Sequence, residues 1–249
     1  MPISNASLLD EDFSAIDDWT SGDQAPAEST QETFDTEETL CQDTNGSAAG
    51  NDYAYLYRDV GSIEGLGNTI TISIKFYHDL IGTLTDADYY WLYCFRSDWG
   101  FNALFASDGL FIYDGTTNNE VGVNLVQQDT WQKWTFVIDL SGGVDSAVCD
   151  IYLDDVLQAS DVDCSATGSF TDGLIQLAQF GDTTDDQITY ADYLKIGDDI
   201  VTPTVISDSK INISDVFKSL DSAKINIGDV WKDVVSIKQN IGDTWKTIF

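Results

Sequence analysis

Acidic side chains are the most numerous groups in this chain that could do acid–base chemistry, but their spacing does not form a catalytic pair. Glycan hydrolysis uses two carboxylates, roughly 5–10 Å apart, that flank the scissile bond. Of the seven glutamates, Glu28 and Glu32 are four residues apart, but they lie in loop-like sequence. The single histidine, His78, would have to serve alone in nucleophilic catalysis, and its place after an apolar run favours a structural role. The sequence therefore predicts a protein that is not an enzyme.

Sugar binding is the second kind of chemistry that the residue types allow. A sugar site combines an exposed aromatic ring with polar groups beside it. The segment 96–101 lies between two β-like runs and places Trp99 among such groups. The predicted carbohydrate-binding residues are Trp99, Asp98, Arg96, Asn102 and Tyr90. In the competing interpretation, Trp99 and Phe101 fill the core.

The elements that would position these side chains are β-strands. Residues 69–77 alternate cleanly between apolar and polar, and Tyr53, Tyr55 and Tyr57 alternate in the same way. Further strands are predicted at 102–106, 110–113, 131–139, 147–153, 174–180 and 189–196, with turns at 107–109 and 154–155. The continuous aromatic run 89–95 is typical of a strand covered on both faces. About a dozen short strands without a long helical pattern predict an all-β sandwich or jelly roll.

The segment 131–139, a Gly-containing turn and the segment 149–157 resemble the concanavalin A-like, laminin-G-type jelly roll. In that family a Trp-led strand precedes a hairpin that ends in Tyr-Val-Asp-Gly, and Asp155 stands here in place of the glycine. The closing run 188–196 is similar to the last strand of such modules. The resemblance covers about residues 8–200 and implies the fold, whereas lectins, glycanases and adhesion modules all share it.

The same resemblance implies a structural calcium ion that ties the first strand to the last. The matching positions are Asp10, Glu11 or Asp12 with Asp192, and we expect Asp12 and Asp192 as ligands. Calcium takes six to eight oxygen ligands, which carboxylates and backbone carbonyls supply. The acidic loop 182–186 is an alternative site, and simple solvation of these aspartates is the remaining interpretation.

The charge is distributed unevenly along the chain. Residues 1–209 hold five basic and 38 acidic side chains, whereas residues 210–249 hold six lysines and five aspartates. A surface this acidic repels nucleic acid and anionic membranes. No run reaches the roughly 18 apolar residues of a membrane helix, so neither nucleic-acid binding nor membrane insertion is expected.

The N-terminal residues lack the basic start and apolar stretch of a signal peptide, which predicts synthesis in a cytosol. The spacings of Cys41, Cys94, Cys149 and Cys164 match no zinc pattern. Because a cytosol is reducing, we expect four buried thiols.

The last forty residues contain one motif three times, at 210–218, 224–232 and 238–246, with a period of fourteen. In each copy a Gly-Asp or Ser-Asp pair separates two short runs, which predicts a β-hairpin. Such small units expose their apolar faces, so we expect them to oligomerise, as a homotrimer, or to anchor the chain. The predicted contact residues are Phe217, Trp231, Trp245, Ile213, Ile227 and Ile241. The alternative is a minor domain that packs on the jelly roll.

These observations together divide the chain into an arm at 1–7, a jelly roll at 8–200, a linker at 201–209 and three hairpin repeats at 210–249. The repeats resemble short C-terminal repeats of tailed-phage structural proteins. The resulting hypothesis is a non-enzymatic virion surface protein, anchored by its repeats to sister chains and other virion proteins. Its jelly roll would present a lectin-like surface to glycans. The alternatives are an extracellular bacterial carbohydrate-binding module and a glycan hydrolase.

Overall fold

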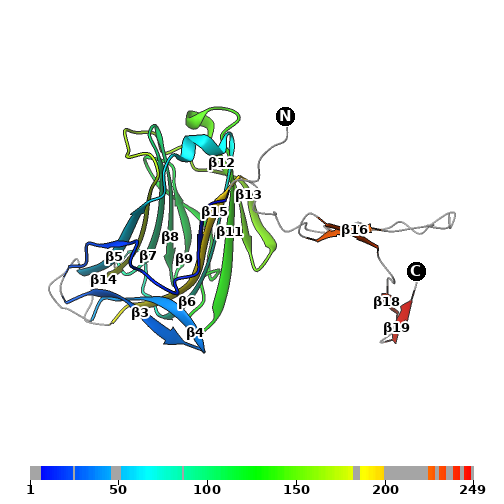
Figure 1. Cartoon of the computed structure of the whole chain (residues 1–249), viewed down its shortest axis with the longest axis horizontal. Helices are drawn as coiled ribbons and strands as arrows, with labels where there is room; N and C mark the ends of the chain where they lie inside the picture. The colour runs from blue at the N-terminus through cyan, green and yellow to red at the C-terminus, as the bar shows by residue number, and fades with distance from the viewer. Residues whose placement is uncertain are drawn as a thin grey trace. The chain divides into compact units, whose positions relative to one another are not determined.

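The computed structural model describes residues 7–24, 26–45, 52–85, 87–181, 186–198, 224–227, 230–233, 238–241 and 244–247. Contacts between residues divide the chain into two units, Met1–Val205 and Ile206–Phe249. The first unit holds two antiparallel sheets, which face each other in Figure 1.

One sheet has eight strands in the order β13-β12-β11-β6-β15-β4-β3, with β1 also paired to β15. Its strands are β1 (Ser7–Glu11), β3 (Glu28–Phe34), β4 (Glu37–Asp43), β6 (Thr69–Leu80), β11 (Trp131–Asp139), β12 (Val148–Leu153), β13 (Val156–Asp163) and β15 (Ile188–Gly197). Strands β1 and β4 share one edge of β15, each pairing with a different half of it.

The second sheet has seven strands in the order β10-β9-β8-β7-β14-β5-β2. These are β2 (Thr20–Ser21), β5 (Asp52–Asp59), β7 (Tyr90–Arg96), β8 (Trp99–Ala106), β9 (Gly109–Tyr113), β10 (Asn118–Gly122) and β14 (Leu174–Gly181). Strands that are far apart in sequence, β5, β14 and β7, are therefore neighbours in this sheet.

The core lies between the two sheets because each strand turns one set of alternate residues inward. In β6 these are Ile70, Ile72, Ile74 and Phe76, all with 0% exposure. They meet inward side chains of the other sheet, and Phe76 lies edge-on to Phe105 with a centroid distance of 4.6 Å. The period-two pattern in the sequence therefore predicted this face of β6 correctly.

Two predicted turns are confirmed. Ser107 and Asp108 join β8 to β9, and Asp154 and Asp155 join β12 to β13. Both aspartates of the second turn have positive φ, 49° and 66°, the backbone that a tight two-residue hairpin requires. The change from Gly to Asp155 is therefore compatible with the hairpin.

The first unit also contains two short 3₁₀ helices, η1 (Ile63–Leu66) and η2 (Val144–Ser146). No helix in the described part of the chain is long and apolar enough to span a membrane. All four cysteines, Cys41, Cys94, Cys149 and Cys164, are buried as predicted, and they are free thiols in the structure.

In the second unit the described strands form two separate hairpins. β16 (Lys224–Ile227) pairs with β17 (Val230–Asp233), and β18 (Lys238–Ile241) pairs with β19 (Thr244–Thr247). The first copy of the repeat lies outside the described residues. So do the side chains of all six predicted contact residues, and their role in oligomerisation stays a prediction.

Candidate functional site

The outer face of the seven-stranded sheet is unusually rich in aromatic rings. In β7 the residues Tyr90, Leu92 and Cys94 point into the core, whereas Trp91 and Tyr93 alternate with them and are partly exposed. The aromatic run at 89–95 is thus buried on one face and not on both, which corrects the sequence interpretation.

Strand β5 contributes in the same way. Ala54 and Leu56 are buried, at 0% and 1% exposure, and the tyrosines between and beside them face outward. The alternation of Tyr53, Tyr55 and Tyr57 therefore places three rings on the same surface as those of β7.

Strand pairing brings these residues into two lines that cross the sheet. In the first line, Tyr57 pairs with Gln176, Gln176 with Tyr93, and Tyr93 with Asn102. We call it the tyrosine–amide row; its first five residues are Thr20, Tyr57, Gln176, Tyr93 and Asn102. The pair Ala103–Ile112 sets the register of β8 and β9, so Tyr113 and its partner Asn118 continue the line.

The second line, the apolar row, runs beside the first. It comprises Tyr55, Ala178, Trp91, Leu104, Phe111 and Glu120. Ala178 and Leu104 are almost covered, with 4% and 5% exposure, because large rings flank them. The row therefore gives the surface a hydrophobic strip next to a strip of polar groups.

The rings touch one another and form a continuous layer. Trp91 lies 5.1 Å from Phe180, and Phe180 lies 5.6 Å from Tyr53, measured between ring centroids. Tyr93 stacks on Phe95 at 5.0 Å. Contacts of this kind add about 0.5–1.5 kcal/mol per pair and hold the rings in fixed positions.

Burial raises the pKa of Tyr93 and Tyr89 above their usual range. Tyrosine hydroxyl groups are already protonated at neutral pH, and these two can donate hydrogen bonds. Asn102 accepts a hydrogen bond from Trp91 Nε1 through its Oδ1, so the polar and aromatic groups of the two rows are joined. Rigid rings beside fixed donors and acceptors are the arrangement that binds sugars.

Two of the predicted carbohydrate-binding residues are in the core, which contradicts their assignment. Trp99 has 0% exposure and donates from Nε1 to the carbonyl of Cys164 at 2.7 Å. Tyr90 has 0% exposure and donates to Gln42 Oε1 at 2.8 Å. Neither ring can stack on a sugar, and the competing interpretation of Trp99 as a core residue is the correct one.

Of the other three predicted residues, Arg96 and Asp98 are partly exposed, whereas Asn102 has 7% exposure. Arg96 and Asp98 form a two-point ion pair at the β7–β8 turn, with distances of 2.6 and 2.9 Å. This pair satisfies both groups and lowers the pKa of Asp98. Asn102 belongs to the tyrosine–amide row, so it is the one predicted residue that the structure places among the outward-facing rings.

The surface carries no close pair of carboxylates among its strand residues. Only Asp59 and Glu120 face outward there, on β5 and β10, and four strands separate them. Five strand spacings are about 24 Å, far beyond the roughly 5–10 Å that glycoside hydrolysis needs. His78 lies in the core with 1% exposure, so it does not reach this face.

The predicted calcium ligands line one cavity of about 470 Å³, but they do not form a cation site. Asp192 Oδ2 lies 2.6 Å from the ammonium group of Lys75, and Asp12 Oδ1 accepts from the backbone of Ser14. Lys133 and Lys195 line the same cavity. No group of three metal-ligating side chains occurs in the described ranges. These residues do not fit calcium, which avoids ammonium groups and needs six or more oxygens.

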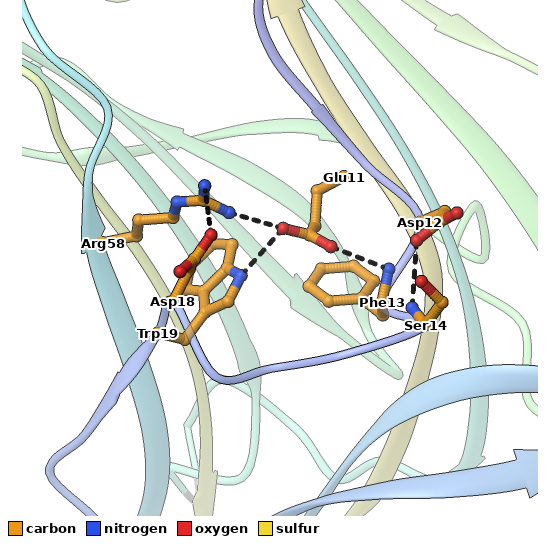
Figure 2. A network of polar contacts seen from close by, with 7 residues as sticks. All are labelled: Glu11, Asp12, Phe13, Ser14, Asp18, Trp19 and Arg58. Atoms are coloured by element: carbon orange, nitrogen blue, oxygen red, sulfur yellow. Dashed lines mark hydrogen bonds and ion pairs between the residues drawn. The ribbon is translucent and has the colours of Figure 1, made fainter.

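A guanidinium group instead holds the first strand to the body, as Figure 2 shows. The carboxylate of Glu11, at the end of β1, accepts three hydrogen bonds. The donors are Arg58 Nη1 at 2.6 Å, Trp19 Nε1 at 3.2 Å and the backbone N–H of Phe13 at 3.0 Å. Arg58 also binds Asp18 at 3.1 Å. Because Arg58 lies on β5 and Glu11 on β1, this network joins the two sheets.

We expect Arg58→Ala to lower the free energy of unfolding by about 2 kcal/mol, since Glu11 would lose a charged hydrogen-bond partner. The loss is smaller than for a fully buried pair because the Arg58 side chain keeps 24% exposure. Urea unfolding of the two proteins measures it. A chelator should leave the melting temperature of the wild type unchanged; a fall on chelation, with Arg58→Ala as stable as wild type, would restore the calcium prediction.

The residues that sequence reasoning missed are the outward aromatics, chiefly Trp91, Tyr93, Tyr55 and Tyr57. A signal was present, since aromatic residues occupy every second position in both 53–57 and 89–95. Two strands with rings on one face predict an aromatic surface once the strands are known to belong to the same sheet.

Comparison with known proteins gives no family and no curated relative, since no family model and no curated protein matches the chain. Solved structures do match. The endo-β-1,4-glucuronan lyase of the fungus Trichoderma reesei has a TM-score of 0.57 and 11% identity, over 80% of this chain and 99% of the lyase.

A carbohydrate esterase of the Shiga toxin-encoding bacteriophage phi24B has a TM-score of 0.52 and 14% identity, over 78% of this chain and 98% of the esterase. The carbohydrate recognition domain of Emp46p, in its metal-free form, has a TM-score of 0.50 and 12% identity, over 80% of this chain and 100% of that domain. The fold is a concanavalin A-like jelly roll. The predicted fold class of the body is thereby confirmed, while the jelly roll alone assigns no activity, since enzymes and binding domains both share it.

Proposed function

We propose that the jelly roll is a non-enzymatic glycan-binding module, and that sugars bind on the outer face of its seven-stranded sheet. The observation that carries this proposal is the continuous layer of partly exposed rings with amide side chains in register beside it. Sugar rings have apolar faces and polar edges, and this surface offers rings and hydrogen-bonding groups side by side.

The absence of catalysis is part of the proposal. It is supported by the separation of Asp59 from Glu120 and by the burial of the single histidine. A hydrolase would need an acid and a base near the bound sugar, and the strand residues of this face supply only tyrosines and amides there.

A glycan array tests the proposal with three proteins. We expect the wild type to bind, and Trp91→Ala to lose about 30-fold in affinity, because removing a central aromatic contact costs about 2 kcal/mol. Trp131→Ala is the matched control, since Trp131 is a partly exposed ring on the other sheet. Equal binding by wild type and Trp91→Ala would contradict the site, and thermal unfolding would show that each variant folds.

We further propose that the protein is displayed on a virion surface and held there by its C-terminal repeats. The three copies of the motif and their near-neutral charge, beside a strongly acidic jelly roll, support an anchoring or self-associating role. The likeness to a bacteriophage protein is compatible with this setting. The mass in solution should be that of a trimer for the whole chain and of a monomer for residues 1–205; a monomeric whole chain would contradict the trimer.

A further inference from the structure

The tyrosine–amide row has a regular composition that narrows the kind of glycan. Along its centre the residues alternate between a tyrosine and an amide: Tyr57, Gln176, Tyr93, Asn102, Tyr113 and Asn118. Each step is one strand, so neighbouring tyrosines are about 9.6 Å apart and the outer two about 19 Å. A binding surface for a single sugar would not need three equally spaced rings.

The spacing fits a chain in which every second sugar presents the same face. In a β-1,4-linked hexose chain each unit is turned over relative to the one before it, so the repeating unit is a disaccharide. That repeat is about as long as two strand spacings. A chain laid across the strands would therefore stack one sugar of each pair on Tyr57, Tyr93 and Tyr113, with the sugar between them over an amide.

The amide of Gln176 is available for such contacts. It lies between Tyr57 and Tyr93, is partly exposed, and has no hydrogen-bond partner among the residues that the structure describes. Gln176 can therefore donate to a sugar hydroxyl. Asn102 has 7% exposure, accepts from Trp91 Nε1 through its Oδ1 and forms a second side-chain hydrogen bond with Tyr93, so it holds these two rings in place.

Charge decides between neutral and acidic glycans. No member of the row is charged, and the segment 1–209 has only five basic residues against 38 acidic ones. Two of the five, Arg58 and Arg96, are paired with carboxylates. The other three, Lys75, Lys133 and Lys195, lie on the eight-stranded sheet. A glycan with carboxylate or sulfate groups would meet a negative field without a partner cation.

We infer that the row binds a linear, uncharged, β-1,4-linked hexose chain that crosses the strands, and that it holds about three disaccharide units. This inference rests on the proposed function and adds the charge, linkage and length of the ligand. It makes the centre and one end of the row separable in experiment, because Tyr93 and Tyr113 contact different units of the glycan.

Calorimetric titration with cello-oligosaccharides tests the length of the binding site. Affinity should rise by about fivefold from disaccharide to tetrasaccharide and again to hexasaccharide, and then level off, as each step adds one stacked ring. Tyr113→Ala should remove one of the two steps. Tyr93→Ala should leave the tetrasaccharide no tighter than the disaccharide, while the hexasaccharide, which still reaches Tyr57 and Tyr113, keeps one step. Tyr193→Ala, on the other sheet, should behave as wild type. Affinity that does not change with length would overturn the inference.

Oligomers of β-1,4-linked glucuronic acid test the charge, because they have the same backbone with a carboxylate in place of each C6 hydroxymethyl group. We expect them to bind at least about tenfold more weakly than cello-oligosaccharides at low salt. Equal or tighter binding would overturn the inference. If such an acidic or a branched glycan binds and Trp91→Ala weakens it, the proposed function stands while the inference fails; if no glycan binds, both fail.

Discussion

Replacing Trp99 by alanine should lower the free energy of unfolding by about 3–5 kcal/mol, the usual loss for a large aromatic ring in a close-packed core. Trp99 begins β8, a strand whose eight residues are all buried. Its ring lies against the core, and its Nε1 bond to Cys164 would also be lost. Because small domains are stable by only about 5–15 kcal/mol, the change removes a large share of the total.

Urea unfolding measures this loss, and Trp91→Ala is the informative comparison. Trp91 is partly exposed on the outer face, so its removal should cost about 1–2 kcal/mol while weakening glycan binding. Trp99→Ala at a temperature where it remains folded should bind glycan as the wild type does. A small stability change together with a loss of binding would return Trp99 to the site.

The second large effect is a loss of folding stability at acid pH that comes from the buried His78. His78 Nδ1 lies 2.8 Å from Thr189 Oγ1, and that hydroxyl donates to Gln179 Oε1, so Nδ1 carries the proton and donates to Thr189. Nε2 has no hydrogen-bond partner in the described part of the chain. Burial lowers the pKa of His78 from 6.5 to about 3, because a charged ring would be enclosed by Phe76, Tyr90 and Phe105.

This lowered pKa makes the protein less stable in acid. The unfolded chain binds a proton at His78 below about pH 6.5, whereas the folded chain does not until about pH 3. Between these values the unfolded state holds the extra proton, so stability falls as the pH falls. The contribution is about 1.4 kcal/mol per pH unit and reaches roughly 5 kcal/mol at the acid end.

His78→Leu separates this contribution from that of the many carboxylates. The variant should be slightly less stable than wild type at neutral pH, because Thr189 loses a donor. It should gain on the wild type by about 1.4 kcal/mol for each pH unit below 6.5. Urea unfolding at several pH values gives the difference, and parallel curves for the two proteins would refute the assignment.

The strands were predictable because local pattern and tertiary burial agree in most of them. The segment 131–139 forms β11 with those bounds, and 69–77 lies within β6. In each, a run of alternate apolar residues, 134–138 in β11 and 70–76 in β6, faces the other sheet, and polar turn residues mark the ends. Strands of this kind can be predicted from their own sequence, without knowing which strands lie beside them.

Trp99 was misplaced because the length of its turn cannot be judged from composition. Residues 96–101 were read as a loop, but only Ser97 and Asp98 form the turn, and Trp99 already belongs to β8. A strand buried on both faces shows no alternation, so its first residue looks like part of the loop. Tyr90 was misplaced for another reason: β7 alternates in burial, but both of its faces are apolar in sequence, so its inward and outward rings could not be told apart.

The aromatic surface could not be assembled from sequence because its strands meet through long-range pairing. Residues 53–57 and 89–95 carry the rings, and both pair with β14, whose segment 174–181 lies far along the chain. The register of β14 decides that Gln176 falls between Tyr57 and Tyr93. Sheet order and register follow from the whole fold and not from any one segment.

The central claim is that glycans bind on the outer face of the seven-stranded sheet, and oxidative footprinting by hydroxyl radicals tests it most directly. Side-chain oxidation would be compared with and without a glycan that the wild type binds. We predict protection of Trp91, Tyr93 and Tyr57, and unchanged oxidation of Trp131 and Tyr193 on the other sheet. Protection of Trp131 and Tyr193, with Trp91 and Tyr93 oxidised as before, would contradict the account.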